Sequence, residues 1–115
     1  MKNKDIVKPG EFRRNNARTG HPAYIVKIDI ELNKEKQSRK KVKFIGITEH
    51  STTHQINNIP LKQNPNPKTP TKPAYIRPKL DEVNLTKKTF GKVLLGWKFV
   101  PEDKEKVNRV IKQKK

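Results

Sequence analysis

The sequence predicts a mainly β fold, a small SH3-like barrel of short antiparallel strands followed by a C-terminal helix. Two segments, 23–32 and 42–48, carry apolar residues with the alternating period of strands. Turns rich in proline and glycine separate the short strand segments, as is typical of small barrels. Only residues 101–111 show the apolar spacing of a helix. We therefore expect four to six strands and one final helix.

The strand pattern is clearest at residues 23–32, AYIVKIDIEL, where every second side chain is apolar. Charged residues take the intervening positions from Lys27 onward, which predicts a half-buried strand. The buried face is predicted to consist of Tyr24, Val26, Ile28, Ile30 and Leu32.

Residues 42–48, VKFIGIT, form the second predicted strand, and the charged segment 33–41 is predicted to be the loop between the two. Ile45 and Ile47 lie on one side and Val42 and Phe44 on the other, so both faces are expected to be covered. Gly46 indicates a bulge or a close backbone approach. The two strands are predicted to pair as an antiparallel hairpin.

The remaining segments carry weaker patterns. Residues 1–22 are polar and are predicted to be irregular, whereas 58–61 and 74–77 are short strand candidates, the first confined to an edge by Pro60. The proline-rich segment 62–73 is predicted to be a stiff loop. Between 79 and 100 we expect a strand near Val83, a turn at 89–91 and a last strand within 93–99. Pro101 suits the first position of the helix 101–111.

The chain of 115 residues is long enough for one domain and too short for two ordinary cores. We expect a flexible basic N-terminus at 1–8, a single barrel domain at 9–111 and a basic tail at 112–115.

The charge balance is strongly positive, with 28 Lys and Arg against 11 Asp and Glu and a net charge of +17. Phosphates of a nucleic acid attract such a surface, because binding releases their condensed counterions. RNA is therefore the first expected partner. An acidic protein partner and simple solubility are the alternatives, and an acidic protein that masks a nucleic-acid site would combine two of them.

Several function classes lack their motifs. The chain has no cysteine, which excludes disulfides, thiolate metal sites and thiol nucleophiles. It shows no P-loop, no GxGxxG and no HExxH, so no cofactor and no metal are expected. No secretory pattern or apolar run of membrane-spanning length is present, and the expected location is the cytoplasm, without membrane contact.

The order of elements resembles the MazF/PemK family of growth-inhibiting toxins. Residues 9–12, PGEF, resemble the opening turn of that family, 20–26, GHPAYIV, its "RP" strand, and 44–48, FIGIT, its "iT" strand. Residues 59–61 and 74–76 fall at its next strands, 90–96 at its last turn and 102–107 at the start of its helix. His21 stands where the family has an arginine. The resemblance implies an SH3-like barrel, commonly a homodimer, that cuts single-stranded RNA without metal and is neutralised by an acidic antitoxin or immunity protein.

Metal-free RNA cleavage needs a base for the ribose 2′-OH, an acid for the leaving 5′-oxygen and a group that stabilises charge on phosphorus. Histidine suits both proton transfers. His21 is the first catalytic candidate, and His50 or His54 is its acid–base partner. Thr48, at the position of the family's threonine, would bond a phosphoryl oxygen. The alternatives are a loop histidine at position 21, an ordinary strand threonine at 48 and, for His50 with His54, an incomplete zinc site.

The basic side chains supply RNA-binding candidates, since arginine clamps phosphate with two hydrogen bonds. A solvated basic surface is the alternative for these positions. Two of these candidates, Lys40 and Lys41, belong to the predicted hairpin tip that also carries Lys34, Lys36 and Arg39. The aromatic candidates would either stack bases or fill the core, and they are Tyr24, Phe44, Tyr75 and Trp97. The RNA-binding candidates are Arg13, Arg14, Arg18, Ser51, Arg77, Lys40 and Lys41.

Two other functions fit the same residues. A non-catalytic nucleic-acid-binding barrel would show steep salt dependence and no cleavage products. An interaction module for an acidic peptide would bind protein and leave RNA alone.

Overall fold

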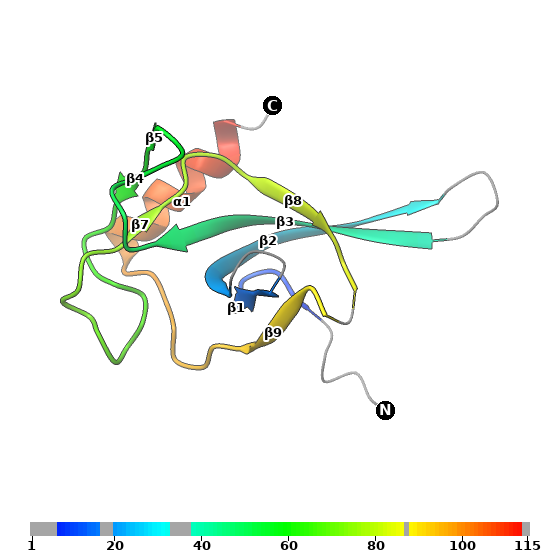
Figure 1. The fold of residues 1–115 in the computed structure, drawn as a ribbon, viewed down its shortest axis with the longest axis horizontal. Coiled ribbons are helices and arrows are strands. Elements are labelled where there is room, and N and C mark those ends of the chain that lie inside the picture. The colour runs from blue at the N-terminus through cyan, green and yellow to red at the C-terminus, as the bar shows by residue number, and fades with distance from the viewer. Residues whose placement is uncertain (1–6, 17–19, 33–37, 87, 114–115) are drawn as a thin grey trace.

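Seven strands form one antiparallel sheet, and a single helix packs against it (Figure 1). The computed structural model describes residues 7–16, 20–32, 38–86 and 88–113. A separate two-stranded hairpin, β4–β5, stands beside the main sheet. The elements are β1 (Phe12–Asn15), β2 (His21–Leu32), β3 (Ser38–Thr48), β4 (Thr52–Thr53), β5 (Ile56–Asn57), β6 (Ile59–Pro60), β7 (Tyr75–Ile76), β8 (Asp81–Asn84), β9 (Phe90–Val93) and α1 (Pro101–Gln113).

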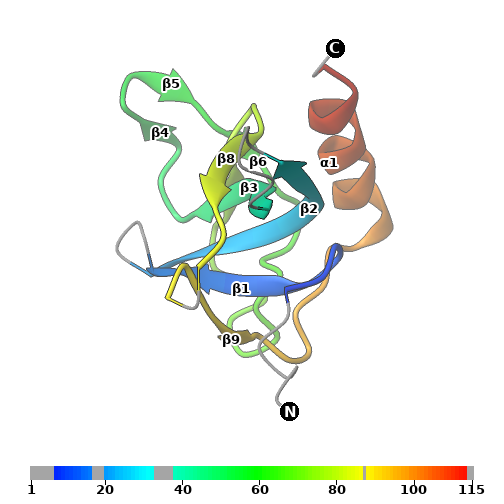
Figure 2. The same cartoon turned by 90° about the vertical axis from the view of Figure 1, so that its right-hand side faces the viewer.

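Strand β3 is the centre of the sheet. Residues 38–46 pair with β2 on one edge, while the other edge pairs with β8 at residues 41–44 and with β7 at residues 47–48. The sheet continues from β2 through β1 to β9 in one direction and from β7 to β6 in the other. Figure 2 shows the strands curving around a common interior. The predicted mainly β, barrel-like fold with a C-terminal helix is confirmed.

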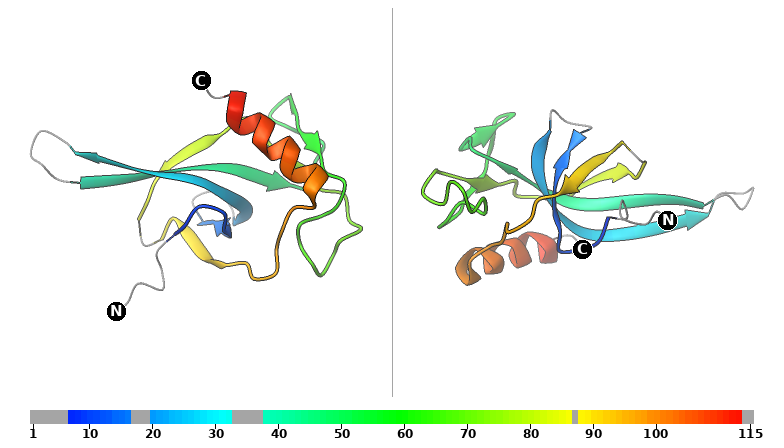
Figure 3. Two further views of the ribbon diagram at one scale, coloured as in Figure 1. Left: turned by 180° about the vertical axis from the view of Figure 1, so that it is seen from behind. Right: turned by 90° about the horizontal axis from the view of Figure 1, so that it is seen from below.

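The two faces of β3 bury two separate groups of apolar side chains. Ile45 and Ile47 join Tyr24 and the helix residues Val107 and Val110 in the cluster beneath α1. Figure 3 shows α1 lying across this face of the sheet. The opposite face of β3 contributes to the barrel interior, whose buried members are Val7, Ala23, Ile25, Val42, Phe44 and Phe90. The prediction that β3 is covered on both sides is therefore confirmed.

A β-bulge at Val26 overturns the alternation predicted for 23–32. Ile25 pairs with Phe44 and Lys27 with Lys43, so Val26 is the extra residue. Tyr24 and Val26 accordingly face the helix, whereas Ile28 packs into the barrel interior. Ile30 is 64% exposed, because the β2–β3 hairpin projects beyond the globule there (Figure 1).

Several predicted boundaries were wrong, and strand pairing explains each one. Residues 12–15 form β1 rather than an irregular segment, because they pair with both β2 and β9. β3 begins at Ser38, inside the segment predicted to be a loop. The last strand is β9 at Phe90–Val93, so the expected turn at 89–91 and the expected strand within 93–99 both lie too far along the chain.

The two short strands predicted at 58–61 and 74–77 are confirmed at the other edge of the sheet. Ile59–Pro60 forms β6 at the end of the sheet, and Tyr75–Ile76 forms β7 beside it. The helix begins at Pro101 and continues to Gln113, slightly beyond its predicted end. Within the part of the chain that the structure describes, no helix is long and apolar enough to cross a membrane. The predicted N-terminal segment falls mostly, and the tail partly, outside the described residues.

Candidate functional site

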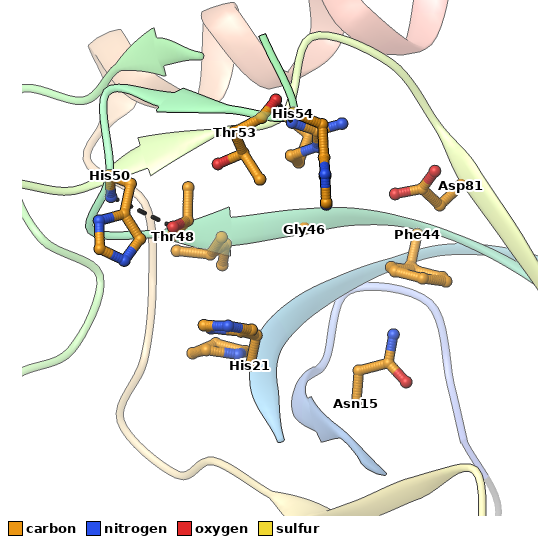
Figure 4. A pocket seen from close by; sticks show the side chains of 12 residues that line it. Asn15, His21, Phe44, Gly46, Thr48, His50, Thr53, His54 and Asp81 are labelled. Atoms are coloured by element: carbon orange, nitrogen blue, oxygen red, sulfur yellow. Dashed lines mark hydrogen bonds between the residues drawn. The ribbon is translucent and has the colours of Figure 1, made fainter. Parts of the chain in front are cut away.

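A pocket of about 490 Å³ opens between the start of β2, the end of β3 and the β4–β5 hairpin (Figure 4). Its lining includes His21, Thr48, His50, His54 and Arg77, which come from four different parts of the chain. All four predicted catalytic residues and one predicted RNA-binding arginine thus lie around one cavity. Their convergence is the main structural observation about this protein.

His21 is placed by the hairpin that joins β1 to β2. Gly20 adopts a φ of 75°, which favours glycine, and its N–H donates to the carbonyl of Asn15 at 2.9 Å. Asn15 and His21 are directly paired across the two strands. His21 is therefore the first residue of β2, with its side chain exposed at the mouth of the pocket.

Thr48 and His50 are joined by a local hydrogen bond at the end of β3. The Thr48 hydroxyl oxygen accepts the N–H of His50 at 3.1 Å (Figure 4), the pattern by which a threonine ends a strand and starts a turn. Because its oxygen accepts this bond, the Thr48 hydroxyl hydrogen is left for a ligand in the pocket. The side chain of His50 is exposed.

His54 occupies a two-residue turn between β4 and β5. Both turn residues lie in the left-handed region, with φ of 54° for His54 and 64° for Gln55. This is the conformation of a type I′ hairpin turn, which residues other than glycine and asparagine adopt at some cost. The hairpin brings His54 to the same pocket as His50.

Asn58 holds this loop together, and the sequence analysis missed it. Its side-chain Nδ2 donates to the carbonyl of His50 at 3.0 Å and to the Thr53 hydroxyl at 2.9 Å. Its Oδ1 accepts a hydrogen bond from Arg77 at 3.2 Å. The side chain is buried, with 7% exposed. Only the presence of an asparagine at the end of a mostly polar segment hinted at such a role.

Arg77 reaches the pocket by crossing Gly46. A Cβ atom at position 46 would lie 3.1 Å from Cγ of Arg77, a tight contact that would require the arginine side chain to shift. The sequence predicted a bulge or a close backbone approach at this glycine, whereas the close neighbour is the side chain of Arg77. Nη1 of Arg77 is held by the carbonyl of Thr53 and by Asn58, while Nε and Nη2 have no partner among the described residues. A guanidinium that is held in place and keeps two nitrogen atoms available as donors is suited to bind a phosphate.

Asp81, at the start of β8, also lines this pocket, and sequence reasoning did not single it out. Its main chain pairs with Phe44, which sets it across the cavity from His50 (Figure 4). Among the residues that the structure describes, no three His, Asp or Glu side chains are placed to hold one metal ion.

Arg13 does not contribute to this surface, which corrects its prediction as a phosphate contact. Its guanidinium is 4% exposed, donates to a Glu11 carboxylate oxygen at 2.8 Å and donates to the carbonyl of Gly91 at 2.9 Å. A buried, paired guanidinium ties β1 to β9 and is not offered to solvent.

The other RNA-binding candidates are distributed around the molecule. Arg14 is exposed, donates to the carbonyl of Gly20 at 3.0 Å and lines a second pocket. Ser51 is exposed but lines neither cavity, while its carbonyl accepts the N–H of Asn58. Lys40 and Lys41 lie on the projecting β2–β3 hairpin, away from the histidines. Arg18, Lys34 and Lys36 lie outside the described residues.

The second pocket, of about 260 Å³, adjoins the first. It shares His21, Thr48 and His50 with the larger cavity and adds Glu49, Asn66 and Trp97. Tyr24 and Phe44, two of the predicted stacking residues, are instead buried in the core. Phe44 nevertheless lines the first pocket, and Trp97 lines the second.

Comparison of the chain with protein-family models, with curated proteins and with solved structures finds no match.

Proposed function

We propose that this protein is a metal-independent endoribonuclease that cleaves single-stranded RNA, as its resemblance to the MazF/PemK toxins implies. The observation that supports this is the convergence of all three histidines of the chain on one pocket, together with Thr48 and Arg77. Histidine pairs perform both proton transfers of such a reaction, and a positioned cation stabilises the phosphorane. The net charge of +17 supplies the general attraction to RNA.

In the proposed reaction, His21 takes the proton of a ribose 2′-OH. The freed oxygen attacks the adjacent phosphorus and forms a new P–O2′ bond, while the P–O5′ bond breaks. His50 or His54 gives its proton to the departing 5′-oxygen. Arg77, through Nε and Nη2, and the Thr48 hydroxyl stabilise the extra negative charge on the phosphoryl oxygens. The products are a 2′,3′-cyclic phosphate and a 5′-hydroxyl.

A second function, a non-catalytic nucleic-acid-binding barrel, rests on a different observation. The β2–β3 hairpin projects from the globule and carries Arg39 and Lys40, both exposed (Figure 1). A basic arm of this kind binds a phosphate backbone without any catalysis. The protein partner that the resemblance implies for the nuclease is an acidic antitoxin, whose binding would mask the same positive surface.

Incubation of the purified protein with mixed single-stranded RNA in EDTA, followed by end-group analysis, tests the first function. We expect fragments with 2′,3′-cyclic phosphate and 5′-hydroxyl ends. His21→Ala should bind the RNA with unchanged salt dependence and leave it intact. RNA that stays whole with the unaltered protein, yet is bound with steep salt dependence, would favour the binding barrel.

A further inference from the structure

The second pocket lies immediately beside the proposed cleavage pocket. The two cavities share His21, Thr48 and His50, so these residues border both of them. A strand of RNA with a phosphate at these shared residues can place a neighbouring nucleotide in the second pocket. This inference rests on the proposed function, and it concerns which base that pocket accepts.

Asn66 presents a hydrogen-bond donor to the second pocket. Its Oδ1 accepts the N–H of Lys68 at 3.0 Å, which fixes the orientation of the amide. Its Nδ2 has no partner among the described residues, and Asn66 lines the pocket. Asn64, by contrast, is buried, and both ends of its amide are used inside the loop. Asn64 therefore stabilises the loop, whereas Nδ2 of Asn66 is available to donate a hydrogen bond to a ligand.

Glu49 presents acceptors to the same pocket. Its carboxylate is 57% exposed, and its ion pair with Lys72 is long, at 3.8 Å. Such a surface pair is weak and leaves the carboxylate oxygens open to a ligand. A carboxylate accepts two adjacent N–H donors better than one, as its bidentate pairs with arginine show.

Trp97 gives the pocket an aromatic wall. Its ring packs 6.0 Å from that of Phe12, measured between centroids, which anchors it to the core. The proline-rich loop is fastened beside it, because the N–H of Lys98 donates to the carbonyl of Pro65 at 3.3 Å and Gly96 lies close to Pro67. Aromatic rings of this kind stack unpaired RNA bases, whose Watson–Crick edges are then read by hydrogen bonds.

We propose that the second pocket binds the base of the nucleotide next to the scissile phosphate and prefers guanine. The guanine ring stacks on Trp97, its N1–H and N2–H donate to the Glu49 carboxylate, and its O6 accepts from Nδ2 of Asn66. Guanine alone among the four bases offers two neighbouring donors beside one acceptor on this edge. Adenine, cytosine and uracil each match only part of the pattern.

Trp97 is the only tryptophan in the chain, so its fluorescence reports occupancy of this pocket directly. The experiment titrates the full chain with 2′-fluoro tetranucleotides, which lack the attacking hydroxyl, carrying guanine, inosine, adenine, cytosine or uracil at each position in turn. We expect quenching to be tightest with guanine at one position. Inosine, which lacks the 2-amino group, should bind about ten-fold more weakly there.

Two variants test the assignment of the polar groups. Glu49→Gln should abolish the difference between guanine and inosine, and Asn66→Asp, which keeps the acceptor for Lys68 but loses the donor, should weaken guanine binding about ten-fold. Glu105→Gln, the same charge change on exposed helix surface, should change neither. Equal quenching by all five bases, or a guanine preference that survives Glu49→Gln, would overturn the proposal. Cleavage of the matching RNA is measured separately. Guanine-selective binding without cleavage would contradict the proposed nuclease activity only, and cleavage without base preference would contradict the proposed guanine subsite only.

Discussion

Nη1 of Arg77 donates a hydrogen bond to Oδ1 of Asn58 at 3.2 Å, and this contact ties β7 to the loop that carries His50 and His54. Both side chains are shielded from solvent more than their residue types usually are. The same amide holds the carbonyl of His50 from its other end. One buried asparagine therefore sets the relative positions of a cation and of two histidines.

Replacement of Asn58 by alanine should loosen the site and the fold together. The change removes three side-chain hydrogen bonds, leaves the His50 carbonyl without its side-chain donor and takes away one of the two acceptors that hold Arg77. We expect the free energy of unfolding to fall by about 2 kcal/mol, as measured by urea denaturation. RNA cleavage should fall more than RNA affinity, because the catalytic groups lose their mutual position.

Asn57→Ala is the matched control for this change. Asn57 is exposed and its side chain makes one hydrogen bond, to the Thr52 hydroxyl. Its loss should cost a few tenths of a kcal/mol at most. Equal effects of the two alanine variants on cleavage would contradict the role given to Asn58.

Gly46→Ala should act through Arg77. The added Cβ would lie 3.1 Å from Cγ of Arg77, so the arginine must move although the backbone of residue 46 tolerates alanine. Overpacking of this kind costs about 1–3 kcal/mol. In a double-mutant cycle measured on cleavage rate, we expect Gly46→Ala to be harmful alone and nearly silent once Arg77 is alanine. Additive effects would mean that the glycine matters for another reason.

His21→Gln should abolish cleavage while sparing the fold. Glutamine keeps a polar side chain of similar length, and position 21 is exposed, so thermal unfolding should be unchanged. Loss of a general base lowers the rate by roughly 10²- to 10⁴-fold. Single-turnover cleavage at saturating RNA measures this loss separately from binding. A His21→Gln protein that cleaves at the normal rate would remove His21 from the mechanism.

The sequence was sufficient for the strands whose patterns are local. Alternation in 42–48 predicted both faces of β3, and the spacing after Pro101 predicted α1. The Val26 bulge reversed the face of Ile28, because a single extra residue shifts every later side chain and no residue type marks it. Strand β1 was missed because its polar residues are held by pairing with β2 and β9, which is a non-local interaction.

The sequence singled out the three candidate histidines but not the residues that hold them in place. His21, His50 and His54 were chosen for their chemistry, and the fold brings all three to one cavity. Arg13 was misjudged because a basic residue in a polar segment reads as exposed, whereas its pairing with Glu11 buries it. Asn58 could not be chosen over its neighbour Asn57 without the fold, since burial alone distinguishes the two.

Asp103→Asn should loosen the proline-rich loop. The carboxylate is fully buried and accepts the N–H groups of Lys62 and Gln63 at 2.7 and 3.1 Å. An amide in its place turns a donor toward one of these N–H groups, so we expect a loss of about 3 kcal/mol in stability. Base selectivity should weaken at temperatures where the variant is still folded, whereas Glu102→Gln, at an exposed carboxylate on the same turn, should leave both properties intact.

The projecting β2–β3 hairpin should govern RNA affinity without governing chemistry. Arg39 and Lys40 are exposed near its end and lie apart from both pockets. If each contacts one phosphate of a single strand, the double alanine variant should reduce the slope of log affinity against log salt by about 1.4. The cleavage rate at saturating RNA should stay the same, because the hairpin contacts the RNA equally in the ground state and in the transition state.

The matched control for the hairpin removes the same two charges from helix α1. Arg109 and Lys112 are exposed there, so the double variant Arg109→Ala, Lys112→Ala changes the net charge equally. Filter binding across a series of salt concentrations measures both slopes. If the helix variant lowers the slope as much as the hairpin variant does, the RNA responds to total charge and the hairpin makes no contact of its own. A smaller slope for the hairpin variant alone places the phosphate backbone along β2 and β3, because only charges that touch phosphate release counterions.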